Sequence, residues 1–306
     1  MTRWPIGRLT VVALAMAAGA VSVAVGQEGN KQPAKVLVRP AYKEGRLLRY
    51  RLKLSGATVW TPDARELEWG KRNTDFTFVL RGKTLRQTGA CTFELLGQSL
   101  RSAAEGPKGK VEVEASPEKA KIKANGKWAT SRTHNPLHKE MTVTFGPRGA
   151  YRFGTGLWRI AVYLLPHVDV RFWTLLTSAP ENEVAPGDSW HEEFQLPVPG
   201  AKGKPLHLTG SWKVLGWQTY RGQKVLAMAL AAELDLRDSD LLLNNGDRVR
   251  VHTGVYLAKG KALWDVKHGA LCSATAEQKI LVKASGSKPR ALRSEHKCSL
   301  QLLAGK

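Results

Sequence analysis

The sequence predicts a mainly β fold: a curved antiparallel sheet, of half-barrel or open-barrel type, with one or two short helices packed on it. Apolar and polar residues alternate at a period of two along most of the chain. Short turn signals rich in Gly, Pro, Asn and Asp separate these stretches. One segment, residues 156–177, has apolar residues spaced as in a helix instead.

Residues 1–26 have the pattern of a secretory signal peptide. Arg3 and Arg8 are followed by an apolar run over residues 9–25, and small residues at its end place cleavage before Gln27. A single membrane anchor is the alternative, because the run is close to the shortest that spans a bilayer. We expect an exported protein, periplasmic or extracellular, with no stable membrane span after signal cleavage.

After the signal peptide, the polar composition of residues 27–35 predicts a disordered lead. The alternating pattern that follows predicts an antiparallel β domain over residues 36–306. This domain is either a single body or two lobes, residues 36–155 and 178–306, joined by segment 156–177.

The N-terminal half predicts a series of half-buried strands. In the best defined of them Arg49, Arg51 and Lys53 alternate with apolar residues and form the wet face. A turn near Gly82 joins two further strands into a hairpin. The predicted strands cover residues 36–38, 47–54, 75–81, 89–96, 111–115, 120–124, 141–145 and 151–153.

The spacing of apolar residues in segment 156–177 predicts a buried helix, broken at Pro166, that packs against the concave face of the sheet. It is not a membrane span, because charged residues such as Arg159 and Asp169 interrupt it.

A turn at Pro186-Gly187-Asp188 leads into a strand that begins near Trp190. Further on, a cap at residues 237–240 predicts a short helical turn over 241–243, and Lys259-Gly260 predicts a turn. The remaining predicted strands cover residues 190–196, 207–215, 224–236, 248–257, 261–266, 270–283 and 291–303.

The chain is strongly basic, with 47 Lys and Arg against 26 Asp and Glu and a formal net charge of +21. This charge favours attraction to polyanions such as cell-wall polymers, acidic lipid surfaces or acidic glycans. The alternative is a set of solvated faces, because the charges are dispersed along the strands. Export and the lack of a nucleic-acid motif argue against nucleic acid as a partner.

Three cysteines are too few for a disulfide framework. Cys272 and Cys298 lie in consecutive predicted strands whose turn falls near their midpoint, so a hairpin could join them in a disulfide. Two separate buried thiols are the alternative. We expect Cys91 to be free.

Gly187-Asp188-Ser189 resembles the nucleophile block of the Gly-Asp-Ser esterase family, and Asp265-Val266-Lys267-His268 supplies an Asp-x-x-His pair. The resemblance implies Ser189 as nucleophile, His268 as base and Asp265 as the residue that orients it. The flanking pattern argues against this hypothesis, because that fold needs a buried parallel strand before the serine. We therefore expect no catalytic residues.

Two other groups of polar residues are not expected to form a metal site or an acid–base pair. His134 and His138 would share a face only in a helix, which Pro136 forbids, so we expect no metal. Glu192 and Glu193 are neighbours on a strand and point to opposite faces. No cofactor is expected.

The chain contains ten tryptophans. Those in strand settings, Trp190, Trp212, Trp217 and Trp264, either pack in the core or line a ligand groove. The weak ligand-binding candidates are Trp158, Trp173, Trp212 and Trp217.

Four turn-plus-strand motifs, at residues 45–52, 186–190, 216–225 and 260–269, together resemble uncharacterised secreted β-rich domains of bacteria. Those domains are similar in outline to periplasmic lipoprotein-carrier half-barrels. The resemblance implies a binding or structural module and carries over no functional residue. We therefore expect an exported, noncatalytic β module that binds an apolar or amphiphilic ligand in a sheet-lined groove, or that has a structural role in the envelope. Polyanion binding is the second hypothesis and the esterase the third.

Overall fold

The structure is a computed structural model that describes residues 35–61, 70–106, 109–124, 126–131, 135–148, 151–153, 179–196, 201–202, 206–238, 240–243, 248–285 and 290–303. The chain divides into two units, Met1–Gln32 and Pro33–Lys306, and every described residue belongs to the second. The predicted signal peptide (1–26) and the predicted helical segment 156–177 lie outside the described residues. Within the described ranges, no helix has the length and hydropathy of a membrane span.

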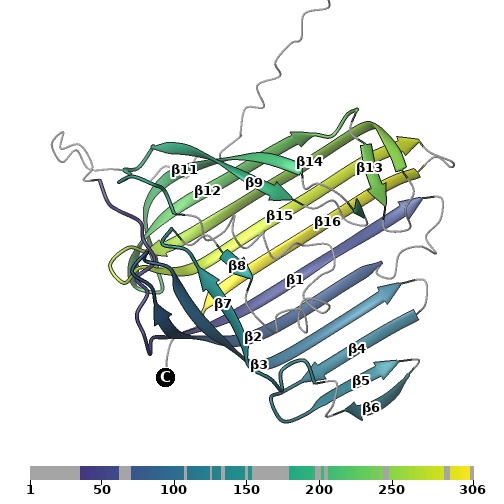
Figure 1. The fold of residues 1–306 in the computed structure, drawn as a ribbon, viewed down its shortest axis with the longest axis horizontal. Coiled ribbons are helices and arrows are strands. Elements are labelled where there is room, and N and C mark those ends of the chain that lie inside the picture. Colours follow the sequence, from purple (N-terminus) through teal and green to yellow (C-terminus); the bar gives the residue numbers. More distant parts are fainter. Residues whose placement is uncertain are drawn as a thin grey trace, which may run out of the picture. The chain divides into compact units, whose positions relative to one another are not determined.

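The described residues form one antiparallel sheet, which is curved and open as predicted (Figure 1). Its main path runs β6-β5-β4-β3-β2-β1-β16-β15-β14-β12-β11-β9, so β1 pairs with the last strand of the chain. The strands are β1 (Leu47–Thr61), β2 (Lys71–Leu85), β3 (Cys91–Gly106), β4 (Gly109–Ala115), β5 (Ala120–Ala124), β6 (Lys127–Ser131), β7 (Met141–Phe145), β8 (Tyr151–Phe153), β9 (Ser189–Leu196), β10 (Ala201–Lys202), β11 (Leu206–Tyr220), β12 (Gln223–Asp235), β13 (Asp240–Leu243), β14 (Arg248–Asp265), β15 (Ala270–Ser285) and β16 (Arg290–Leu302).

The sheet has an inner face of buried side chains and an outer face of exposed ones. On β1, Leu52 and its neighbours two residues away are buried, whereas Arg51 and Lys53 are exposed. Leu52 lies opposite Phe76 on β2 and opposite Leu300 on β16, so apolar rows continue across the strands. A slip of one residue would move every one of these side chains to water, so the alternation fixes which face each strand buries.

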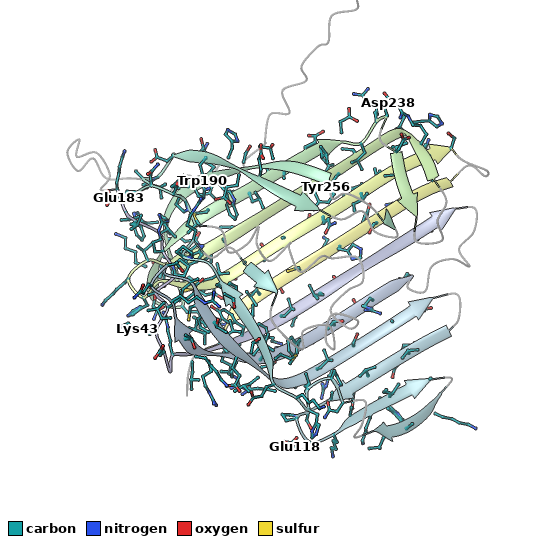
Figure 2. All side chains as sticks on the ribbon, in the orientation of Figure 1. Lys43, Glu118, Glu183, Trp190, Asp238 and Tyr256 are labelled. Atoms are coloured by element: carbon teal, nitrogen blue, oxygen red, sulfur yellow. The ribbon has the colours of Figure 1, made fainter. Side chains whose placement is uncertain are left out.

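Segments outside the main path cover one end of the inner face. β7 contributes Met141 and Val143 to the core cluster. Tyr42, which precedes β1, packs edge-on against Phe93 with ring centroids 5.3 Å apart, and it also contacts Phe145. Figure 2 shows the side chains gathered at this end, around Lys43 and Glu183.

The turn before β9 forms as predicted. The Ala185 N–H donates to Asp188 Oδ2 at 2.9 Å, and the Asp188 N–H donates back to the Ala185 carbonyl at 3.1 Å. Gly187 has a φ of 97°, a conformation that favours glycine. This turn delivers Trp190 to the inner face, where it packs against the core.

Three local predictions were wrong. Residues 241–243 are not a helical turn but part of β13, because Asp238 adopts a φ of 61° and the chain then pairs back onto β14. Gly260 is not in a turn but inside β14, opposite Ala276 and Leu230. Gly82 lies inside β2, and the β2–β3 turn contains Gly89 instead, with a φ of 78°.

Candidate functional site

The inner face is lined with buried side chains. Trp212 on β11 is 1% exposed and stacks on Trp190 of β9, with ring centroids 5.7 Å apart and planes 7° apart. Trp212 therefore packs in the core and does not line an accessible groove. Trp217 is half-buried against the same core, and the Lys224 ammonium lies 5.0 Å from its ring centroid. The other two ligand-binding candidates, Trp158 and Trp173, lie outside the described residues.

The predicted disulfide is not formed, because the hairpin register separates Cys272 from Cys298. Cys298 lies opposite Ala276, four residues along β15 from Cys272. At about 3.3 Å per residue this offset is about 13 Å, beyond the reach of a disulfide. The pair Ala284 and Arg290 centres the hairpin on position 287, not on the cysteine midpoint of 285. Cys91, Cys272 and Cys298 are all buried and free.

Of the three esterase-like residues, the structure brings together only two. His268 Nδ1 lies 2.6 Å from Asp265 Oδ2, and the His268 backbone N–H donates to the other carboxylate oxygen at 3.0 Å. Burial opposes the charge of Asp265, but these hydrogen bonds outweigh it and hold the pKa of this carboxyl below its usual range. Ser189 begins β9, three strands from β14 in the sheet order. At about 4.8 Å per strand, Ser189 is at least about 14 Å from this pair.

The polar residues of β9 point to opposite faces. His191 is exposed and lies 3.0 Å from the Ser211 hydroxyl, and Glu193 is exposed beside it. Glu192 points the other way and pairs with Arg148. Among the described residues, which exclude His134, no group of three His, Cys, Asp or Glu side chains could hold a metal.

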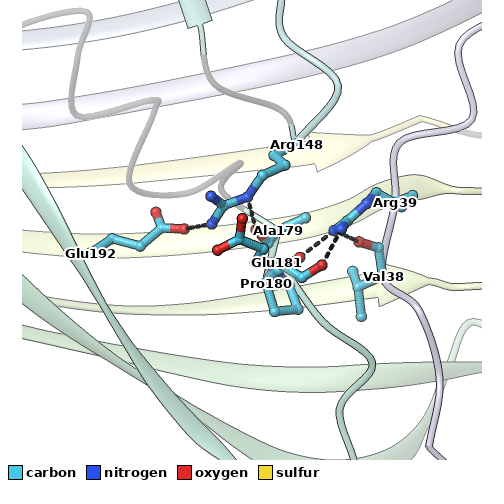
Figure 3. Close-up of polar contacts among 7 residues, drawn as sticks. All are labelled: Val38, Arg39, Arg148, Ala179, Pro180, Glu181 and Glu192. Atoms are coloured by element: carbon cyan, nitrogen blue, oxygen red, sulfur yellow. Dashed lines mark hydrogen bonds and ion pairs between the residues drawn. The ribbon is translucent and has the colours of Figure 1, made fainter. Parts of the chain in front are cut away.

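Two arginines hold chain segments together (Figure 3). Arg148 joins β9 to the segment that precedes it, and Arg39 joins that segment to the one that precedes β1. Arg148 binds Glu192 and also donates to the Ala179 carbonyl at 3.2 Å. Arg39 donates to the carbonyls of Val38, Pro180 and Glu181. Burial and the nearby Arg148 lower the pKa of Arg39, against the opposing charge of Glu181. Since these contacts are made largely to backbone carbonyls, they position chain segments and do not form an open site.

A group of polar side chains, spread over three neighbouring rows of the sheet, lies among the apolar side chains of the inner face. Arg72 and His296 are each 5% exposed. The Thr74 and Ser102 hydroxyls are 2.9 Å apart, and the Ser294 hydroxyl lies 2.8 Å from His296 Nε2. Burial, and secondarily the charge of Arg72, lowers the pKa of His296 to about 4. In the sequence these residues appear only as polar residues at strand positions an even number of residues from the apolar ones, and the strand predictions did not use this signal.

The outer face contains an apolar groove of about 820 Å³. Its apolar lining includes four residues that face outward on neighbouring strands: Val59 on β1, Ala291 on β16, Leu281 on β15 and Val255 on β14. Leu281 lies directly opposite Val255, and Val59 is 45% exposed. Elsewhere on this face the same strands carry mainly Lys, Arg, Glu, Ser and Thr, although Leu257 on β14 and Leu47 on β1 are also exposed. The volume falls in the range of small-molecule sites in proteins.

Charged side chains surround this apolar groove. Arg237, Lys283 and Arg293 contribute three positive charges, against two negative charges from Glu233 and Asp235. Arg293 lies opposite both Leu281 and Val59 and donates to Glu295 at 3.2 Å.

Asp235 accepts from Arg237 Nε at 2.6 Å. No carboxylate of the described residues pairs with Lys283. The groove therefore combines apolar side chains with a slight excess of basic ones, and Arg293 lies between Val59 and Leu281.

Sequence reasoning missed the groove, although a signal for it exists. On β1 the outer positions run Arg49, Arg51, Lys53 and Ser55 and then change to apolar residues, ending at Val59. Leu281 and Val255 break the polar phase of their strands in the same way. The sequence alone does not show that these breaks meet, because strand order and register decide it.

Comparisons with known proteins leave the family open. No model of a known protein family matches the sequence, and no curated protein matches it. A solved structure concerning lipid–protein interactions in lipovitellin has a TM-score of 0.44 and 10% identity, and the match covers 86% of this chain. The chain spans 25% of the length of that protein.

Two further solved structures have lower scores. DynF from the dynemicin biosynthesis pathway of Micromonospora chersina has a TM-score of 0.20 and 9% identity, with 93% of this chain and 94% of DynF covered. OccK11 of Pseudomonas aeruginosa has a TM-score of 0.19 and 8% identity, with 86% and 98% covered. Likenesses this weak carry no functional argument, so function is argued from the chain's own geometry.

Proposed function

We propose that the protein is an exported, noncatalytic module that binds an anionic amphiphile in the apolar groove of its outer face. One observation carries the proposal: Val59, Val255, Leu281 and Ala291 place apolar side chains around Arg293 in one groove of the outer face. An exposed apolar surface of this kind, rimmed by polar residues, is typical of a ligand or interaction site.

The two parts of an amphiphile match the two parts of the groove. An acyl chain on Leu281 and Val255 removes apolar surface from water, at about 25 cal/mol per Å² buried. An anionic head group meets Lys283 and Arg293. Arg293 lies in the same row as Leu281, so the charge and the apolar side chains are adjacent.

Binding of a fluorescent long-chain fatty acid to the full chain tests the proposal, with unlabelled palmitate and its uncharged methyl ester as competitors. We expect palmitate to compete more strongly than the ester, because only palmitate offers a carboxylate to the basic side chains. Leu281→Glu should abolish binding, because it places a charge among the apolar side chains and offers Arg293 a competing carboxylate.

Leu215→Glu is the matched control, since Leu215 is an exposed leucine on β11 that does not line the groove. It should bind like the original chain. No binding of the fatty acid, or equal binding by both variants, would contradict the proposed site.

The basic composition of the chain supports polyanion binding, but the arrangement of charges on the outer face supports it less well. The net charge of +21 favours it, but several lysines of this face pair with carboxylates on neighbouring strands. Glu277, for example, pairs with Lys259 at 3.1 Å and with Lys297 at 3.2 Å. Such a pattern provides no continuous run of free cations for a polyanion.

A further inference from the structure

A second hollow on the outer face, here called the polar trough, has a different chemistry from the apolar groove. It measures about 700 Å³ and crosses β4, β3, β2, β1, β16 and β15. Trp128 of β6 lines it at the sheet edge. The lining contains no residue of the apolar groove.

The floor of the polar trough follows one row of the sheet. Ala103 lies opposite Asn73, and Asn73 lies opposite Ser55. The row continues to Glu112 on β4 and to Lys297 on β16. Small side chains in the middle with long polar ones at both ends leave a channel that runs across the strands, with hydrogen-bonding groups along it.

Trp128 provides an exposed aromatic face at one end of this row. Its side chain is 47% exposed, and the Lys123 ammonium lies 5.7 Å from the ring centroid. Lys123 is in turn 3.6 Å from Glu112, so an ion pair holds this ammonium over one face of the ring and leaves the other face open for a ligand. A tryptophan held in this way offers a flat apolar surface at the border of a polar channel.

The trough is nearly uncharged although the chain is strongly basic. Lys53, Arg101 and Lys297 give three positive charges, and Asp75, Glu112, Glu114 and Glu277 give four negative ones, a balance of −1. Several of these charges are already paired; Asp75, for example, accepts from Arg51 Nε at 2.9 Å. Paired charges hold the side chains in fixed positions and leave no net field for a polyion.

We infer that the polar trough binds an uncharged, hydroxyl-rich glycan chain, with one sugar ring stacked on Trp128. The apolar face of a pyranose suits the indole ring, and its hydroxyls suit amide, carboxylate and hydroxyl groups such as those of Asn73, Glu114 and Ser55. A polyanion would meet four carboxylates, and an acyl chain would meet a polar floor. This inference is independent of the amphiphile proposal, because the two sites share no residue.

Calorimetric titration of the full chain with cellohexaose, maltohexaose and chitohexaose tests the inference. We expect at least one of these uncharged hexasaccharides to bind, and Trp128→Ala to weaken that binding about tenfold or more, as for a central aromatic contact. Leu281→Glu, in the apolar groove, should leave glycan binding unchanged.

Trp128 is exposed on a short edge strand, so its replacement should leave the fold intact, and the circular dichroism spectrum checks this. Arg101→Ala is a second variant, within the trough and away from the ring, and should also weaken binding. Failure of all three sugars to bind would overturn the inference. Equal binding by Trp128→Ala, or heparin that displaces the sugar with higher affinity, would also overturn it.

Discussion

Gly56 on β1 faces His296 on β16 so closely that a Cβ atom at Gly56 would lie 2.0 Å from His296 Nδ1. The absence of a side chain at position 56 therefore creates the space that the imidazole occupies on the inner face. The same histidine is hydrogen-bonded to Ser294 and lies near Arg72. This contact places a buried polar group in the middle of the sheet, with the buried Thr74, Ser102 and Ser294 in the neighbouring rows.

Gly56→Ala should lower the free energy of unfolding by about 1–3 kcal/mol, the usual cost of overpacking a core. Urea denaturation measures it. In a His296→Ala background the contact with the ring is absent and only the Glu295 carbonyl oxygen, 2.7 Å from the added Cβ, remains close, so the same glycine replacement should cost less. An equal cost in both backgrounds would show that the contact with the ring is not the cause.

Acidification should destabilise the protein before its carboxylates titrate. The pKa of His296 is about 4 in the folded chain, against an ordinary value of 6.5, so the unfolded chain takes up this proton at higher pH. Stability is full above pH 6.5 and falls as the pH drops toward 4, by about 2 kcal/mol between pH 7 and pH 5. Urea denaturation at several pH values gives the profile. His296→Gln removes the titrating group and should flatten this part of the curve; an unchanged slope would count against the assignment.

Replacement by alanine should lower the free energy of unfolding strongly at Trp212 and hardly at all at Trp128. Trp212 is buried and stacked on Trp190, so its loss should cost about 3–5 kcal/mol of unfolding free energy. Trp128 is exposed, and its loss should change stability by less than about 0.5 kcal/mol. Thermal and urea unfolding compare the two variants, and similar losses in both would contradict the assignment of Trp212 to the core.

All three cysteines should titrate as thiols when the protein is unfolded without reductant. Burial raises the pKa of Cys298 to about 12 and also raises the pKa values of Cys91 and Cys272, so the folded protein should react slowly with thiol reagents. A thiol reagent in guanidinium chloride counts them. One remaining thiol instead of three would show that two cysteines are joined.

Local sequence patterns were sufficient for most strands and for several turns. The alternation around Arg49 and Arg51 identified β1 and its wet face, because apolar and polar residues that alternate at a period of two indicate a strand with one buried face. Pro186-Gly187-Asp188 identified the turn before β9, because Gly187 adopts a positive φ there. The turn at Gly260 failed for a related reason: glycine also occurs inside strands, and the letters do not distinguish the two settings.

The candidate sites were less accessible to sequence reasoning. The sequence presents Trp212 as a ligand candidate, but it lies in the core, whereas Trp128, in a short lysine-rich hairpin, is exposed at the edge of the sheet. A tryptophan has the same apolar surface in either setting. Only the position of its strand, central or at the edge, decides whether that surface is covered.

By itself the sequence determined that this chain forms antiparallel strands with one buried and one wet face, because that property depends on residues two apart. Only the tertiary structure decided that β1 pairs with β16, that Cys298 lies opposite Ala276, and that Val59, Leu281 and Val255 meet in one groove. Strand order and register bring together residues more than two hundred positions apart. Nothing in the local alternation encodes those distances, because many pairings bury the same apolar face equally well.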